Sequence, residues 1–216
     1  MRYDLHIHTH YSKCSVLNPS IILDRAKKLG LDGIAITDHN SIKGALAVSK
    51  LNKDRNFEVV RSEEITTDRG HVLALYVHEE IKPGNLFDVL DKIKKQDGLA
   101  IIAHPFAIAS MRSRLKISLK KIKDEIDGIE ILNSRCFFPW ENKKVAIMAK
   151  RAGIAGTAGS DAHFVFEIGR AVTIFDGDLR KAIKGRKIQV DGSIKFASVG
   201  RFLSLVHMIR KRGGVI

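Results

Sequence analysis

Imidazole and carboxylate side chains recur at the ends of apolar, strand-like segments in this sequence. His6 and His8 are two residues apart in such a segment, so both side chains leave the same face and can reach one metal ion. The same placement recurs in Thr37-Asp38-His39, in Ala103-His104-Pro105 and in Gly159-Ser160-Asp161-Ala162-His163. Glu64 near the end of another strand, and His71 at the start of the next one, complete the set.

Any one of these histidines, taken alone, is better explained as an ordinary core or surface residue. Together they indicate a metal site, because the carboxyl ends of barrel strands meet at one rim, where residues distant in sequence become neighbours. A buried carboxylate among imidazoles is unfavourable unless a cation binds it. Imidazole with carboxylate suits Zn, Mn or Fe better than Ca.

Strand and helix patterns alternate along the chain, which predicts an α/β fold with a parallel barrel or doubly wound sheet. Each strand is apolar throughout, as expected where helices cover both faces. A third strand that runs into a hairpin partner interrupts the alternation once. The expected strands are 3–8, 33–37, 58–65, 71–77, 99–103, 128–132, 154–158 and 170–175, and the expected helices are 19–30, 41–53, 85–95, 118–124, 140–152 and 179–183.

The tail from Phe196 to Arg212 is predicted to form a closing helix. Its apolar residues recur at helical spacing, which favours a helix docked on the barrel over one lying on a membrane surface. The basic end at Arg210-Lys211-Arg212 would complement the helix dipole. The residues of the expected apolar face are Val199, Phe202, Leu203, Val206 and Ile209.

Length and composition favour a single domain over residues 1–216. The chain has 216 residues, 44% of them hydrophobic, and contains no linker-like stretch. It has no apolar run near the roughly 20 residues that span a bilayer and no signal-like start, so no membrane association and a cytoplasmic location are expected. Its two cysteines fit a reducing compartment. The formal charge of +13 favours phosphate-bearing partners, although a solvated basic surface explains it equally well.

The ordered set of motifs resembles the PHP superfamily, named for polymerase and histidinol phosphatase domains. The chain carries HxH, a TDH end, Glu64-Ile65-Thr66-Thr67 followed by a Gly-His-Val strand, Ala-His-Pro, and Gly-Ser-Asp-Ala-His, in this order from residue 6 to residue 163. The resemblance implies a distorted (β/α)7, TIM-like barrel with two or three divalent ions, Mn, Zn or Fe, at its rim. It also implies hydrolysis of phosphomonoesters or phosphodiesters by metal-activated hydroxide.

The resemblance further assigns ligands to three ions. It implies that His6, His8, Glu64 and Asp161 hold the first ion, and that Glu64 bridges to a second held by His71 and His104. His39 and His163 would serve a third. Glu64 is preferred to Glu63 because it directly precedes Ile-Thr-Thr. His10, His78 and His207 have no counterpart and are expected at the surface or behind the ligands.

One loop departs from the family pattern. Where similar phosphoesterases often carry Asp or His, this chain has Lys13 and Cys14, so the third ion can be weakly held, absent or replaced by the Lys13 ammonium. Asp38 is expected to orient a ligand or handle a proton. Arg170 is expected to stabilise charge on the phosphoryl group, with Arg135 and Lys13 as weaker candidates.

Two rival functions stay open at this stage. A non-catalytic basic barrel that binds RNA or a replication assembly should have lost several ligands, whereas only one position departs here. An amidohydrolase acting on C–N bonds usually places a Lys between its metals, and no Lys lies at a predicted strand end. The expected substrate is a phosphorylated small molecule, a nucleotide or a nucleic-acid end. The loops 106–115, with Arg112 and Arg114, and 135–140 would choose among them.

Overall fold

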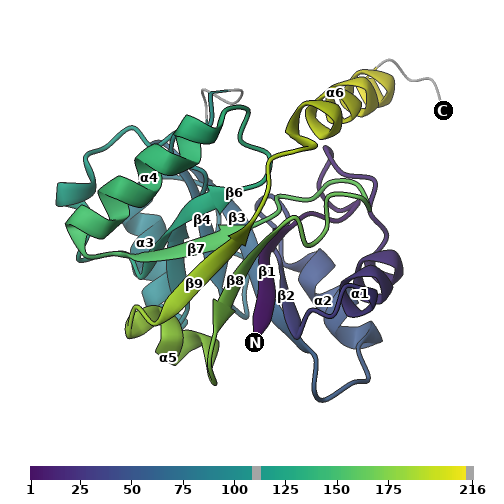
Figure 1. Ribbon diagram of the computed structural model, residues 1–216, viewed down its shortest axis with the longest axis horizontal. Coiled ribbons are helices and arrows are strands. Elements are labelled where there is room, and N and C mark those ends of the chain that lie inside the picture. Colours follow the sequence, from purple (N-terminus) through teal and green to yellow (C-terminus); the bar gives the residue numbers. More distant parts are fainter. Residues whose placement is uncertain (109–112, 213–216) are drawn as a thin grey trace.

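The strands of the protein form a single sheet that bends almost into a barrel (Figure 1). The computed structural model describes residues 1–108 and 113–212. Over these residues the sheet has nine strands in the order β7-β6-β5-β4-β3-β2-β1-β8-β9. They are β1 Arg2–Ile7, β2 Gly33–Ile36, β3 Glu58–Thr67, β4 Gly70–Leu75, β5 Leu99–Ile102, β6 Gly128–Asn133, β7 Ala155–Gly159, β8 Ala171–Phe175 and β9 Ile188–Gly192.

Two parallel blocks make up most of the sheet. Strands β1, β2 and β3 pair in parallel, and so do β5, β6 and β7, while β4 joins the blocks by antiparallel pairing to both sides. Strands β8 and β9 are also antiparallel, β8 to β1 and β9 to β8. The predicted TIM-like barrel is therefore confirmed as a mixed α/β barrel, and the predicted hairpin is present. The antiparallel pairing of β8 and the whole of β9 were not predicted.

The first and seventh strands come together where the barrel nearly closes. Past the end of β7, Ala162 forms a parallel bridge with Ile7, and the Ser160 amide donates to Asp4 at 2.8 Å. A Cβ on Gly159 would lie 2.3 Å from the Cβ of His6, so only glycine permits this approach. The close approach brings the end of β7 beside the HxH segment.

The helices begin and end largely where the sequence places them. Helix α1 (Pro19–Lys28) is capped by Asn18, whose side chain accepts from the Ser20 amide, and Asn85 caps α3 (Leu86–Lys95) in the same way. The remaining helices are α2 (Lys43–Leu51), α4 (Pro139–Ala152), α5 (Leu179–Lys184) and α6 (Ala197–Arg212). None of the helices within the described ranges combines the length and the apolar character that a bilayer-spanning segment requires.

The predicted helix over Ser118–Asp124 is wrong. The structure has only a 3₁₀ turn at Leu119–Lys121. Leu119 and Ile122 are both buried, and a spacing of three residues aligns them on one side of a 3₁₀ turn.

The core lies on both faces of the sheet, as the apolar strands predict. Inside the barrel, Leu5, Leu73, Leu99 and Ile101 belong to one buried cluster. Outside it, α1 and α2 pack on β2, and α3 packs on β4 and β5, in two further clusters. The barrel interior is therefore filled in the described part of the chain, and the cavity over the histidines lies beyond the strand ends.

The closing helix forms over nearly the predicted range, but the face that it buries was predicted wrongly. Val199, Phe202 and Ile209 are 48%, 65% and 60% exposed, whereas Ala197 and Ser204 are buried. The reason is that α6 lies over polar groups: Ser204 Oγ accepts from the Arg135 guanidinium at 3.0 Å. Small and polar residues therefore face the barrel. In Figure 1, α6 lies at the upper end of the molecule, away from α5.

Candidate metal centre

His6 and His8 present their Nε2 atoms to one point at the end of β1. Both side chains are fully buried, and the two Nε2 atoms are 3.1 Å apart. Asp161, just past the end of β7, approaches the same point, with its Oδ1 at 3.3 Å from His8 Nε2 and 3.7 Å from His6 Nε2. Three ligand atoms from two strand ends therefore converge, as the HxH spacing predicts.

Glu64 occupies the centre of the cluster. Its Oε1 lies 2.7 Å from His71 Nδ1 and 2.8 Å from His104 Nε2. Its Oε2 lies 2.9 Å from His39 Nδ1. Glu63 points to the opposite side of β3, where it accepts from the Ile81 amide at 2.7 Å. Of the two glutamates, only Glu64 faces the histidines.

The structure brings all eight predicted ligands together. Within the described residues, four groups of donor atoms are compact enough to hold a metal ion, with every ligand atom of a group within 4.8 Å of the others. These groups are His6-His8-Asp161, His6-Glu64-His104, His39-Glu64-His71 and His8-Cys14-His39-His163. Cys14 is the member that the sequence analysis did not propose as a ligand.

Burial and mutual attraction set the charges in the cluster. Burial opposes ionisation of Glu64, but neighbouring imidazoles outweigh it and hold the pKa of this carboxyl well below its usual value. The pKa of Asp161 is lowered in the same way. Burial also lowers the pKa of His8 and, together with nearby Arg135, that of His163. Both carboxylates are thus ionised and both of these imidazoles neutral near pH 7, the states in which they bind metal.

Glu130 in the middle of β6 supports two ligands and was missed by the sequence analysis. Its Oε1 lies 2.9 Å from His6 Nδ1, and its Oε2 accepts from the His104 amide at 2.8 Å and from Asn133 Nδ2 at 2.9 Å. Since a carboxylate only accepts, His6 carries a hydrogen on Nδ1, which leaves Nε2 facing the point where a metal would bind. The signal that could have revealed it is an acidic residue in the middle of an otherwise apolar strand.

Asp38 lies behind the cluster and organises the loop after β1. Its carboxylate accepts from the Thr9 amide at 2.8 Å, the Thr9 hydroxyl at 2.6 Å and the Ser12 hydroxyl at 2.6 Å. Ser12 Oγ in turn accepts from the His39 amide at 3.0 Å. Asp38 is absent from the four donor groups, so its geometry suits an orienting residue.

Arg170 lies away from the proposed metal ligands, so its predicted contact with the phosphoryl group is wrong. Its guanidinium lies 4.4 Å from the centre of the Phe196 ring, and its Nε donates to the Phe166 carbonyl at 3.0 Å. The cations beside the cluster are instead Arg135 and Arg201, which line the same cavity as the ligands. His10 and His78 are exposed, as expected, and Lys13 is exposed as well.

A cavity of about 450 Å³ opens over the cluster, and α6 forms one of its walls. Arg201, Ser204, Leu205 and Met208 of this helix face it. The Arg201 Nε donates to the Arg135 carbonyl at 2.6 Å, which fixes the helix against the strand ends. Among the described residues that line the cavity there is no lysine. Arg112, proposed with its loop to select the substrate, lies outside the described residues.

The donor set fits divalent metal ions. Two imidazole Nε2 atoms 3.1 Å apart, with carboxylate oxygens at 3.3–3.7 Å, leave a single point where one cation can satisfy all of them. The buried Nδ1 of His104 has no hydrogen-bond partner among the described residues, and the ring is held at its Nε2 beside Glu64. His104 and Asp161 also adopt positive φ values of 25° and 55°, strain that is typical of functional sites.

Two family models match this chain, and the two matched segments together contain all of the proposed ligands. Residues 4–124 match the family model described as PHP domain, and residues 139–186 match one described as PHP-associated. Two proteins of Methanocaldococcus jannaschii are similar. The uncharacterized protein MJ1587 is 39% identical over 146 residues, covering 62% of this chain and 82% of that protein. The uncharacterized protein MJ0417 is 35% identical over 182 residues, covering 81% and 70%.

A solved structure shares the fold. A two-domain protein from Bacteroides vulgatus, which contains a predicted PHP-like metal-dependent phosphoesterase, superposes with a TM-score of 0.74 at 18% identity. The match covers 89% of this chain and 65% of the other, so this chain spans about two thirds of the length of that protein. At this identity the likeness concerns the barrel itself.

Proposed function

This chain belongs to the PHP domain family, and we propose that it is a hydrolase of phosphate esters that works with divalent metal ions. The observation that carries the proposal is the convergence of six imidazoles and two carboxylates beside one cavity, which four of the imidazoles and both carboxylates line. When bound, such ions lower the pKa of water so that hydroxide forms near neutral pH, and they polarise phosphoryl oxygens.

The side chains of the site would hold the ions and orient the ligands. Glu64, between the donor groups, would hold two ions at a fixed separation, and Asp161 with His6 and His8 would complete the first of them. Glu130 and Asp38 would keep the imidazole rings in the orientation that ligation needs. None of these steps requires a nucleophilic side chain.

Arg201 and Arg135 would bind the phosphoryl oxygens of the substrate. Both line the cavity, and charge there favours an anionic group over a neutral amide or ester. Arg135 is 4% exposed and lies 3.6 Å from Glu167, so it has a supporting role in the fold as well. Arg201 is the better probe, because its truncation leaves this buried pair intact and removes only the hydrogen bond from its Nε to the Arg135 carbonyl.

The substrate is proposed by class only. A cavity of about 450 Å³ accommodates a phosphomonoester of a small metabolite or a nucleotide, and the strong positive charge of the chain suits nucleic-acid ends as well. A barrel acting only as a binding module would have no need of a complete donor set. An amidohydrolase is disfavoured because no lysine lines the described part of the cavity.

The test is hydrolysis by the protein loaded with Mn, Zn or Fe, using p-nitrophenyl phosphate, a diester analogue, nucleotides and short oligonucleotides. Activity should disappear with chelator and in Asp161→Asn. Arg201→Met should raise KM at unchanged metal content, whereas Arg170→Met, a matched change outside the cavity, should behave like the wild type. Metal-loaded protein that is inactive on every substrate class would refute the proposal, and loss of activity in Arg170→Met alone would restore Arg170 to the role predicted from sequence.

A further inference from the structure

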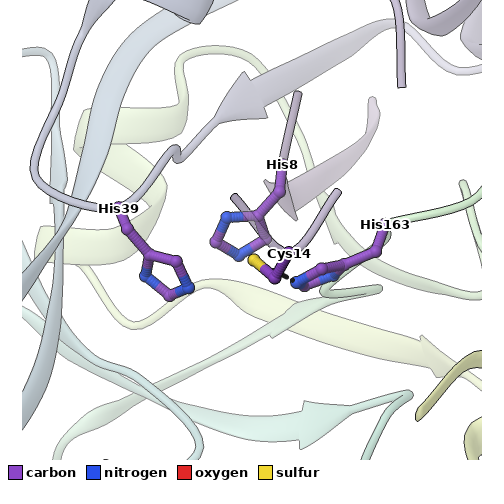
Figure 2. A group of neighbouring side chains, drawn as sticks. All are labelled: His8, Cys14, His39 and His163. Atoms are coloured by element: carbon purple, nitrogen blue, oxygen red, sulfur yellow. Dashed lines mark hydrogen bonds between the residues drawn. The ribbon is translucent and has the colours of Figure 1, made fainter. Parts of the chain in front are cut away.

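A cysteine stands among the imidazoles at one side of the cavity. Cys14 lies in the loop between β1 and α1, and its Sγ is 3.1 Å from His163 Nε2. Figure 2 shows its side chain between the rings of His8, His39 and His163. The four donor atoms lie within 4.8 Å of one another, and Cys14 lines the cavity.

The contacts of the ring nitrogens show which histidines could bind the same ion as Cys14. The Nδ1 of His163 lies 2.7 Å from the Asp161 carbonyl oxygen, and the Nδ1 of His39 lies 2.9 Å from Glu64 Oε2. Each of these two rings therefore has its Nε2 left for a ligand. His8 differs, because its Nε2 already faces His6 and Asp161 in the neighbouring donor group. Two imidazoles and one sulfur remain for an ion of their own.

We propose that Cys14, His39 and His163 bind a third divalent ion through one thiolate and two imidazoles, and that this position selects zinc. The inference rests on the proposed function, since it describes one side of the same cavity. Zn–S bonds of about 2.3 Å and Zn–N bonds of about 2.0–2.1 Å in a tetrahedron put sulfur about 3.6 Å from each nitrogen. The observed 3.1 Å, within a group spanning at most 4.8 Å, requires only small side-chain shifts.

The thiolate distinguishes this position from the rest of the centre. The other donor groups are completed by Glu64 or Asp161, and carboxylate with imidazole accepts manganese, iron or zinc. A thiolate ligand favours zinc over manganese, because manganese prefers oxygen ligands. Three protein ligands leave the fourth position of a tetrahedron for a substrate oxygen. Lys13 of the same loop is exposed and does not line the cavity, so its ammonium does not take the place of the ion.

Cobalt spectroscopy tests the ligand directly, because a thiolate bound to Co²⁺ gives a sulfur-to-metal charge-transfer band that imidazole and carboxylate do not give. The chain has only one other cysteine, the buried Cys136, so Cys136→Ala is the matched control. The full chain titrated with Co²⁺ should show the band in the wild type and in Cys136→Ala, and should lack it in Cys14→Ser. A band that is missing in the wild type, or that survives in Cys14→Ser, overturns the proposal.

Metal content gives a second readout that does not depend on catalysis. After dialysis against limiting zinc, Cys14→Ser should retain one zinc fewer per chain than Cys136→Ala. Its affinity for that ion should fall by more than the about 10- to 100-fold that loss of a residue supporting a ligand costs. Cys14→Asp should regain the ion but admit manganese, since its ligand is now an oxygen. Equal zinc content in Cys14→Ser and the control contradicts the assignment. A cobalt–thiolate band in protein that hydrolyses no phosphate ester would refute the proposed function and leave this site standing.

Discussion

Replacing Glu130 by Gln tests whether a residue that touches no proposed ion controls metal binding. Glu130 accepts three hydrogen bonds, from His6 Nδ1, from the His104 amide and from Asn133 Nδ2, at 2.8–2.9 Å. Glutamine has the same shape but only one accepting oxygen. If its oxygen faces His6, its NH2 group meets the other two donors. If its NH2 group faces His6, the ring must carry its hydrogen on Nε2, where a metal would bind.

Both orientations have an energetic consequence. Leaving one buried donor without an acceptor costs about 1–3 kcal/mol of folding free energy. Losing the carboxylate that orients a metal-binding histidine typically weakens metal affinity 10- to 100-fold, which corresponds to about 1.4–2.7 kcal/mol. Glu130→Gln should therefore unfold at lower urea concentration without metal, and should bind zinc at least about tenfold more weakly.

The assay is competition for zinc against a chromophoric chelator, together with urea unfolding of the metal-free protein. Glu63→Gln is the control for zinc affinity, because it removes a buried carboxylate from the outward side of β3 and leaves the cluster intact. Zinc affinity in Glu130→Gln equal to that of the control would refute the claim that Glu130 fixes the His6 ring.

Three further predictions concern stability. Chelation of the metal-loaded protein should lower its melting temperature, because an ion present at about 100 times its Kd adds about 2.7 kcal/mol to the folded state; an unchanged melting temperature would mean that the donor groups hold no ion. Burial raises the pKa of Glu63 from 4.5 to about 7, so between these values the folded chain keeps a proton that the unfolded chain has lost, and stability falls as pH rises through this window. Glu63→Gln should then be more stable than the wild type by about 3 kcal/mol in urea unfolding at pH 8, with the difference vanishing near pH 4.5. A constant difference would contradict the linkage. In Gly44→Ala the new Cβ would lie 1.9 Å from Asp38 Oδ2, so the free energy of unfolding of this variant should fall by about 1–3 kcal/mol in urea unfolding. Gly84→Ala is the control, because a Cβ at Gly84 would have no atom of the described residues within 4 Å. Equal stabilities of the two variants would show that the Cβ at position 44 is not crowded.

Much of the site could be predicted because its residues follow strands. His6 and His8 share a face through the two-residue period of a strand, and residues such as His39 and His104 come directly after apolar segments. Parallel strand ends must meet at one rim, so chain order alone places these side chains near each other. The same alternation separates Glu64 from Glu63, since neighbouring residues on β3 face opposite sides.

What the sequence could not determine depends on contacts between distant segments. Cys14 meets His163 across 149 positions, and no local pattern encodes this pair. The tail has a clear helical period, yet which of its faces is buried depends on the polar groups beneath α6, where Ser204 meets Arg135. The amino-acid sequence thus determined most of the strands and helices and the positions of the proposed ligands at the strand ends, because those follow from local periodicity. Only the tertiary structure decided which cations, which supporting carboxylate and which thiol share the cavity, because barrel closure sets those distances.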